Sequence, residues 1–147
     1  MSNRAESFPL HRREVAKIIL DASDETLFVT GLGSTNWDFT AAGDCARIFP
    51  LWGAMGGAIT MGLGIALAQP AKRVIVATGD GEALMGIGSL ATVAVQAPQN
   101  LTICIFDNEH YGETGMQETH TASVTDLSLT AQGMGIKDAA TITDDAE

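Results

Sequence analysis

Cationic side chains are scarce in this sequence: its 147 residues include 8 Lys and Arg against 18 Asp and Glu, which gives a net charge of −10. A surface of this charge repels nucleic-acid phosphates and anionic lipid headgroups, so the composition argues against nucleic-acid binding and against a membrane-surface role. Any phosphate group that binds here must therefore be held by backbone N–H groups or by a metal ion.

Cysteine and long apolar segments are also scarce. Cys45 and Cys104 provide neither a disulfide framework nor metal-ligand spacing, so we expect a cytoplasmic location, with Cys104 packed inside the fold. The first ten residues contain no apolar signal core, and the longest apolar stretch, Ala58 to Ala68, is far shorter than the ~20 residues of a membrane-spanning helix. The sequence therefore predicts a soluble protein.

Aromatic residues make up only 5% of the chain, whereas hydrophobic residues reach 46% and glycine occurs 16 times. The interior must then be built mostly from Ala, Val, Ile, Leu and Met, which is typical of helices packed closely on a parallel sheet. A chain of this length is long enough for one core and too short for two. We expect residues 1–147 to form a single domain.

The periodicity of apolar residues predicts alternating helices and strands. Two runs rich in β-branched residues, Arg73 to Thr78 and Leu101 to Asp107, are the clearest strands, and a helix at Ile87 to Gln96 joins them in a right-handed βαβ unit. Further strands are expected at 26–30 and 47–49, and further helices at 11–21, 36–42, 58–68 and 126–134. The predicted fold class is α/β, with an open, mostly parallel sheet and helices on both faces.

Three glycine-rich loops follow predicted strands: Gly31 to Asn36, Gly79 to Gly81, and Asp107 to Gly115. Ligands of an open α/β sheet bind beyond the carboxyl ends of its strands. The middle loop places Asp80 between Gly79 and Gly81, just before a helix, where free N–H groups and the helix dipole suit a phosphate. Because a carboxylate repels a phosphate unless a cation lies between them, Asp80 implies a metal ion, and Mg²⁺ is the usual choice.

Asn108 stands at the end of the next predicted strand, 28 residues after Asp80. Gly-Asp-Gly, an interval of this size and then Asn resembles the motif of thiamine-diphosphate enzymes. The resemblance implies that Mg²⁺ is coordinated by the side chains of Asp80 and Asn108 and by the backbone carbonyl of His110.

Two flanking segments extend the resemblance. Gly53-Ala-Met-Gly-Gly57 is similar to the family segment whose bulky apolar residue, here Met55, props the cofactor into its bent conformation. Gly31-Leu-Gly-Ser-Thr35 is similar to the family loop that adds hydroxyl and N–H contacts to the diphosphate. The resemblance implies this set of cofactor-binding residues: Gly33, Ser34, Thr35, Gly53, Met55, Gly79, Asp80, Gly81, Glu82, Asn108, Tyr111 and Gly112.

The runs from Leu84 to Thr92 and from Tyr111 to Thr121 most resemble the small subunit of sulfopyruvate decarboxylase and the related phosphonopyruvate decarboxylase. Glu82 departs from the decarboxylases, which usually have Ser or Ala there, although transketolase-like members carry Glu. Glu109-His110 is also unusual within its loop. The acidic tail from Thr141 to Glu147 stands where a last helix and strand are expected, so we expect the chain to lack those two elements of the full fold.

Several of these residues also have simpler interpretations. Met55 fits core packing, Ser34 and Thr35 fit helix capping, and Glu82 fits a first-turn residue favoured by the helix dipole. His110 and His120 suit acid–base chemistry because histidine titrates near neutral pH, yet loop histidines are more often simply solvated. These alternatives stay open at this stage.

Other phosphate-binding classes fit the sequence less well. Gly31-Leu-Gly33 follows a strand as in nicotinamide-dinucleotide domains, but Asn36 occupies the third glycine position and the ribose-binding acid is missing. A nucleotide phosphate loop is excluded because the chain contains no Gly-Lys-Ser/Thr. A non-catalytic thiamine-diphosphate-binding or scaffold module remains an alternative.

The resemblance also implies a second domain, which grips the aminopyrimidine ring and supplies a catalytic glutamate. Only 25 residues precede Thr26, so we expect a partner subunit to supply that domain and this chain to contain no catalytic residue. The expected function is the cofactor-binding subunit of a heteromeric decarboxylase that acts on a small 2-oxo acid, of the sulfopyruvate or phosphonopyruvate type. We expect the lone chain to be inactive and to self-associate through Gly53 to Gly57 and the following helix.

Overall fold

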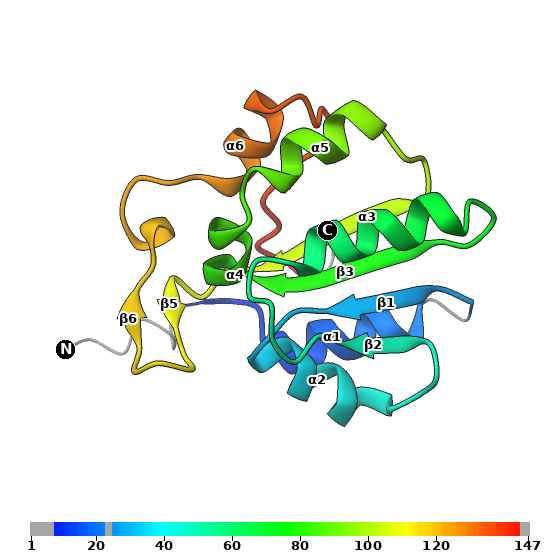
Figure 1. The fold of residues 1–147 in the computed structure, drawn as a ribbon. Helices are drawn as coiled ribbons and strands as arrows, with labels where there is room; N and C mark the ends of the chain where they lie inside the picture. Colours follow the sequence, from blue (N-terminus) through cyan, green and yellow to red (C-terminus); the bar gives the residue numbers. More distant parts are fainter. Residues whose placement is uncertain (1–7, 23–24, 145–147) are drawn as a thin grey trace.

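A parallel four-stranded sheet forms the centre of the computed structural model, which describes residues 8–22 and 25–144 (Figure 1). The strands run in the order β2-β1-β3-β4, and every neighbouring pair is parallel. Their bounds are β1 (Leu27–Thr30), β2 (Ile48–Pro50), β3 (Val74–Gly79) and β4 (Leu101–Phe106). The predicted α/β class and parallel sheet are confirmed.

Helices cover both faces of this sheet (Figure 1). On one face lie α1 (Arg12–Asp21) and α2 (Ser34–Gly43), and on the other lie α3 (Ala58–Ala68), α5 (Ser89–Gln96) and α6 (Leu127–Gly133). The short helix α4 (Asp80–Met85) follows β3 directly. Each helix predicted from the sequence therefore has a counterpart, and the bounds agree to within two residues.

Successive side chains along each strand point alternately into two hydrophobic cores, one on each face of the sheet. Phe28 and Ile75 point toward α1 and α2, whereas their neighbours Val29 and Val76 point toward α3 and α5. Because both faces are covered, all four side chains are at most 7% exposed. Each such side chain contributes roughly 1.5–3 kcal/mol of transfer free energy on burial, which explains why the strands are continuous apolar runs.

Small residues bring α3 onto the sheet. A Cβ at Gly62 would lie 2.1 Å from Val76 Cγ2, so the helix backbone approaches β3 more closely than any side chain at that position would permit. Ala58, Ile59, Leu63 and Ala66 of the same helix are buried. The mix of small and large apolar residues in this segment therefore has a packing reason.

Two local expectations were wrong. Gly79 to Gly81 is not a loop, because β3 continues through Gly79 and Asp80 begins α4, which ends at Gly86. The segment after β4, expected to be a loop, contains a short antiparallel hairpin of β5 (His110–Tyr111) and β6 (Gln117–Glu118), followed by the 3₁₀ turn η2 (His120–Ala122). Strands of two residues leave no periodic signal in a sequence.

The C-terminal expectation is only partly covered, since residues 145–147 lie outside the described part; residues 141–144 contain no helix or strand. Across the described ranges 8–22 and 25–144, no helix combines the length and hydropathy that a bilayer crossing requires.

Candidate functional site

The candidate site lies at the carboxyl ends of β3 and β4. Gly79 and Phe106 are register partners at the ends of these neighbouring strands, so the residues that follow them, Asp80 and Asp107, leave the sheet at the same edge. Asp80 is 2% exposed although it is a carboxylate at the end of a strand. The sheet topology therefore delivers the arrangement that the spacing of Asp80 and Asn108 predicted.

Hydroxyl groups surround the Asp80 carboxylate. Thr119 Oγ1 donates to Asp80 Oδ2 at 2.5 Å and Thr121 Oγ1 at 3.3 Å, and Thr121 Oγ1 also lies 2.7 Å from Asp107 Oδ1. Burial raises the pKa of Asp80 and the charge of Asp107 raises it further, while hydrogen bonds from Thr119, Gly81 N–H and Thr121 act in the opposite direction. A buried carboxylate beside a second carboxylate favours a bound cation.

Asn108 begins a tight turn beside this carboxylate pair. Its Oδ1 accepts a hydrogen bond from His110 N–H at 3.1 Å, and its carbonyl oxygen lies 3.0 Å from His110 Nδ1. Glu109, between them, has a positive φ of 63°. The turn holds the Asn108 amide and the His110 backbone close together after β4.

The donor chemistry of these residues fits Mg²⁺. A carboxylate, an amide oxygen and a backbone carbonyl are hard oxygen ligands, and Mg²⁺ binds few protein oxygens and completes its shell with phosphate and water. The described residues contain no group of three or more His, Cys, Asp or Glu side chains placed to hold a metal. The predicted ligand set is of another type, because Asp80 is its only ligand from these four residue types that binds through a side chain.

The hairpin loop closes over two of the predicted binding loops. A Cβ at Gly81 would lie 2.4 Å from Tyr111 Cε1, so the tyrosine ring packs on the first turn of α4. Gly33 has a φ of +100°, and a Cβ there would lie 3.2 Å from Glu113 Cγ. The three glycine-rich segments predicted to bind the ligand therefore meet at one edge of the sheet, and Tyr111 and Gly112 belong to the hairpin segment that covers it.

The hydroxyl groups after β1 are engaged within the protein. Thr35 is buried and its Oγ1 donates to the Gly31 carbonyl at 2.7 Å, which is a local structural bond. Ser34 Oγ accepts a hydrogen bond from Arg12 Nη1 at 3.2 Å and is only partly buried. Contact of these two side chains with a diphosphate stays a prediction.

Asn36 was not identified from the sequence as a structural residue. It is fully buried, accepts a hydrogen bond from Thr30 Oγ1 at 2.5 Å and donates to the Leu51 carbonyl at 3.2 Å. It thereby joins the end of β1 to the segment that leads to Met55. A polar residue inside a glycine-rich segment was its only sequence signal.

The Met55 loop, defined as Gly53 to Gly57, has an unusual backbone. Gly53, Ala54 and Gly56 have φ values of +131°, +48° and +93°. Met55 is 38% exposed, so it is not an ordinary core residue. Its exposure suits a side chain that meets a ligand, and the role of cofactor prop stays a prediction.

The other candidates separate into structural and solvated groups. Glu82 is 2% exposed, and its Oε2 accepts a hydrogen bond from Thr78 Oγ1 at 2.6 Å. Cys104 packs beside the core under α1 and α2, and burial raises the pKa of its thiol. His120 lies exposed in η2 and His110 is half-buried in β5.

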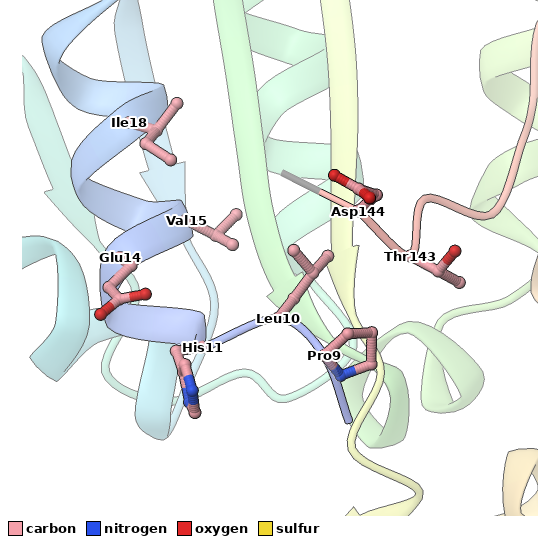
Figure 2. Close-up of a pocket in the computed structure, with 8 residues that line it drawn as sticks. All are labelled: Pro9, Leu10, His11, Glu14, Val15, Ile18, Thr143 and Asp144. Atoms are coloured by element: carbon pink, nitrogen blue, oxygen red, sulfur yellow. The ribbon is translucent and has the colours of Figure 1, made fainter. Parts of the chain in front are cut away.

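A pocket of about 190 Å³ lies elsewhere, between α1 and the C-terminal segment (Figure 2). It is lined by the segment before α1, one side of α1 and the last described residues: Pro9, Leu10, His11, Glu14, Val15, Ile18, Thr143 and Asp144. None of these eight residues belongs to the candidate site.

Comparison with protein families identifies the class of this domain. Residues 35–147 match the family described as thiamine pyrophosphate enzyme, C-terminal TPP binding domain. The chain therefore belongs to the thiamine pyrophosphate enzyme family, which confirms the resemblance found in the sequence.

Among characterised relatives, the sulfopyruvate decarboxylase subunit beta of Methanothermobacter thermautotrophicus is 40% identical over 86% of this chain and 67% of its own length. The corresponding subunit of Methanocaldococcus jannaschii is 38% identical over 83% of this chain and 64% of its own length. Phosphonopyruvate decarboxylase of Streptomyces hygroscopicus is 37% identical over 90% of this chain and 33% of its own length. The chain thus spans about two thirds of the beta subunits and one third of the longer enzyme.

Solved structures support the fold. The thiamine diphosphate-dependent 4-hydroxybenzoylformate decarboxylase of Rhodococcus jostii RHA1 aligns with a TM-score of 0.74 at 23% identity, covering 86% of this chain and 27% of the other. Benzoylformate decarboxylase from Polynucleobacter necessarius aligns with a TM-score of 0.69 at 17% identity, with the same shares covered. At these identities the likeness shows the fold alone.

Proposed function

We propose that this chain binds thiamine diphosphate and Mg²⁺ as the diphosphate-binding subunit of a heteromeric 2-oxo-acid decarboxylase. The observation that carries the proposal is the buried Asp80 carboxylate beside Asp107, at the edge of the sheet where three glycine-rich segments meet. The family and the names of the relatives support the cofactor and the reaction class.

Each residue of the site has a distinct task in this proposal. Asp80 and Asn108 would hold Mg²⁺ through side-chain oxygens and His110 through its carbonyl, while backbone groups of Gly33, Gly79 and Gly81 would face the diphosphate. When bound, thiamine diphosphate supplies a thiazolium ring that accepts the electron pair released as CO₂ leaves a 2-oxo acid. The hydrogen bonds that Thr119 and Thr121 donate to Asp80 Oδ2 would hold the carboxylate in place for the metal.

We further propose that a pyrimidine-binding partner completes the enzyme and supplies the glutamate. Relatives described as subunit beta support a hetero-oligomer. Trp37 and Trp52 are 58% and 55% exposed, and their rings contact each other edge to face with 4.9 Å between the ring centroids. Exposed tryptophans of this kind are typical anchors of protein interfaces. A groove of about 520 Å³ runs along α3 from the Met55 loop and is lined by Leu51, Ala54, Gly57, Thr60, Met61, Gly64, Ile65 and Ala68.

The test measures CO₂ release from sulfopyruvate and phosphonopyruvate by the purified chain alone and by its mixture with a pyrimidine-binding chain. We expect activity only in the mixture and its loss when the partner's glutamate is replaced by Gln. Robust turnover by this chain alone would refute the half-enzyme proposal. Cofactor binding without turnover in any mixture would instead support the alternative, a non-catalytic binding or scaffold module.

A further inference from the structure

We propose that Glu82 is a positioning residue that fixes the Met55 loop relative to Asp80. The inference rests on the proposed function, because it concerns the geometry of the same site. Asp80 and Glu82 both belong to α4, yet their carboxylates contact different parts of the fold. Asp80 accepts hydrogen bonds from Thr119 and Thr121 beyond the hairpin, whereas Glu82 contacts β3 and the start of α3.

Glu82 supplies the acceptor that the start of α3 lacks. Within the described helix α3, the N-cap Gly57 makes no side-chain capping bond and the first turn contains no acidic residue. The Ala58 N–H donates to Glu82 Oε1 at 3.4 Å. Ala58 is 1% exposed and Glu82 is 2% exposed, so the carboxylate takes the place of water at the positive end of this helix.

The absence of a side chain at Gly31 makes room for this carboxylate. A Cβ at Gly31 would lie 1.8 Å from Glu82 Oε2 and 2.6 Å from Thr78 Oγ1. The hydrogen bond from Thr78 Oγ1, at 2.6 Å, holds Oε2 in that position. Gly31 therefore serves the packing of Glu82, and the glycine after β1 and the glutamate in α4 form a matched pair.

A second contact ties the far end of α4 to the Met55 loop. A Cβ at Gly86 would lie 2.1 Å from the Gly56 carbonyl oxygen, and a Cβ at Gly56, whose φ is +93°, would lie 3.1 Å from Gly86 N. The loop is thus held at Gly56 by the end of α4, and Glu82 holds Ala58, the residue that directly follows the loop. Met55, which is partly exposed, takes its position from these backbone contacts.

Loss of the Glu82 carboxylate should loosen the Met55 loop and leave the metal position intact. Asp80 should keep its hydrogen bonds with Thr119 and Thr121, because Glu82 accepts its hydrogen bonds from other residues, Thr78 and Ala58. The matched control is Glu82→Gln, which retains the length of the side chain and one acceptor oxygen.

The first experiment compares melting temperatures of the cofactor-free chain for Gly31→Ala, Glu82→Ser and the double variant. We expect Gly31→Ala to lower Tm by at least about 5 °C, and Glu82→Ser to recover at least about half of that loss in the double variant. Strictly additive shifts would overturn the matched pair. If Gly31→Ala does not fold, refolding by the added Glu82→Ser change supports the pair, and failure of the double variant contradicts it.

The second experiment uses hydrogen exchange and does not need Gly31→Ala. In Glu82→Ser, amides of residues 53–58 should exchange at least about tenfold faster than in the wild type, while amides of residues 119–121 stay unchanged. Glu82→Gln should restore most of the protection. Unchanged exchange at residues 53–58 would refute the positioning role.

Calorimetry and turnover separate this inference from the proposed function. With Mg²⁺, Glu82→Ser should bind thiamine diphosphate within about threefold of the wild type, while kcat of the assembled enzyme falls about tenfold and recovers in Glu82→Gln. A wild-type chain that fails to bind the cofactor contradicts the proposed function. Normal kcat in Glu82→Ser, with normal wild-type binding, contradicts only the positioning role.

Discussion

Asp80 combines burial with the proximity of a second carboxylate. Burying this side chain in its charged form without a positive partner costs free energy, and its raised pKa is a consequence of that cost. A divalent cation would remove it. Ligand binding at this position should therefore be tied to the metal.

Replacing Asp80 tests this dependence. Asp80→Ala should lower Mg²⁺-dependent affinity for thiamine diphosphate at least about 100-fold and leave the circular dichroism spectrum unchanged, because the carboxylate is the central proposed ligand. Asn108→Ala should act in the same direction. Calorimetry in Mg²⁺ and in EDTA provides the measurement, and binding of equal strength in EDTA would contradict the metal assignment.

The raised pKa of Asp80 also predicts a pH effect on stability. A carboxyl whose pKa is higher in the folded state contributes stability below its ordinary value of 3.8 and loses that contribution as the pH rises through the folded pKa. In EDTA, the Tm of the wild type should therefore fall relative to the Tm of Asp80→Asn as the pH increases over that window. Saturating Mg²⁺ and cofactor should reverse the trend, whereas a pH-independent difference would contradict it.

Met55 can be tested separately from the metal. Met55→Ala should leave cofactor affinity within about threefold, because the phosphate and metal contacts remain, but should reduce kcat of the assembled enzyme about tenfold through poorer ring geometry. Since Met55 is 38% exposed, the variant should lose little stability. A variant with wild-type kcat would remove the prop role from this residue.

Among the secondary-structure elements, the six-residue helix α4 organises the site. Its first residue is Asp80, its second receives the Tyr111 ring, and its third is Glu82. A helix this short has little stability of its own, so tertiary contacts must hold it. The contacts of Tyr111 and Glu82 supply them from two sides.

A matched pair of glycine substitutions tests the hairpin contact. Gly81→Ala should destabilise the chain by about 1–3 kcal/mol, because a Cβ there would lie 2.4 Å from the Tyr111 ring. Gly64→Ala is the control: among the described residues nothing lies within 4 Å of its Cβ, so the better helix former should stabilise α3 by up to about 1 kcal/mol. Urea unfolding measures both, and equal effects would argue against the tyrosine contact.

On the scale of the whole molecule, exposed apolar side chains are concentrated near the Met55 loop and along α3. Trp37, Trp52, Met55 and Met61 are each between 38% and 58% exposed in a chain that is otherwise strongly acidic. Such surfaces mark interaction sites when they are contiguous. The position of the groove beside the candidate site suits a partner that completes that site.

The surface predicts self-association of the lone chain. Met61→Glu should shift the protein toward the monomer in sedimentation velocity, because it places a charge in the α3 groove. Val95→Glu is the control, since Val95 is 81% exposed on α5 and does not line the groove. Equal effects of the two changes would indicate nonspecific association.

Local patterns in the sequence were enough to predict the parallel sheet, the helices α1, α2, α3, α5 and α6, and the family. The Asp80–Asn108 ligand pair stays a prediction. Buried parallel strands require β-branched apolar runs, and a carboxylate between glycines at a strand end needs a metal to coexist with phosphate, so both leave a signature within a few residues. The expected loop at Gly79 to Gly81 was wrong because glycine flanking resembles a turn, although the tertiary fold supports a helix from Asp80.

The functions of Thr119, Asn36, Gly31 and Glu82 depended on the three-dimensional arrangement. Thr119 contacts Asp80 across 39 residues of sequence and Glu82 contacts Ala58 across 24, so no local pattern announces either bond. The sequence favoured Glu82 as a first-turn residue stabilised by the dipole of its own helix, whereas in the structure it accepts a hydrogen bond from Ala58 N–H at the start of α3. Such roles arise only when separate loops converge at the carboxyl edge of the sheet, because burial then removes water and leaves each polar group dependent on the neighbour that the fold brings to it.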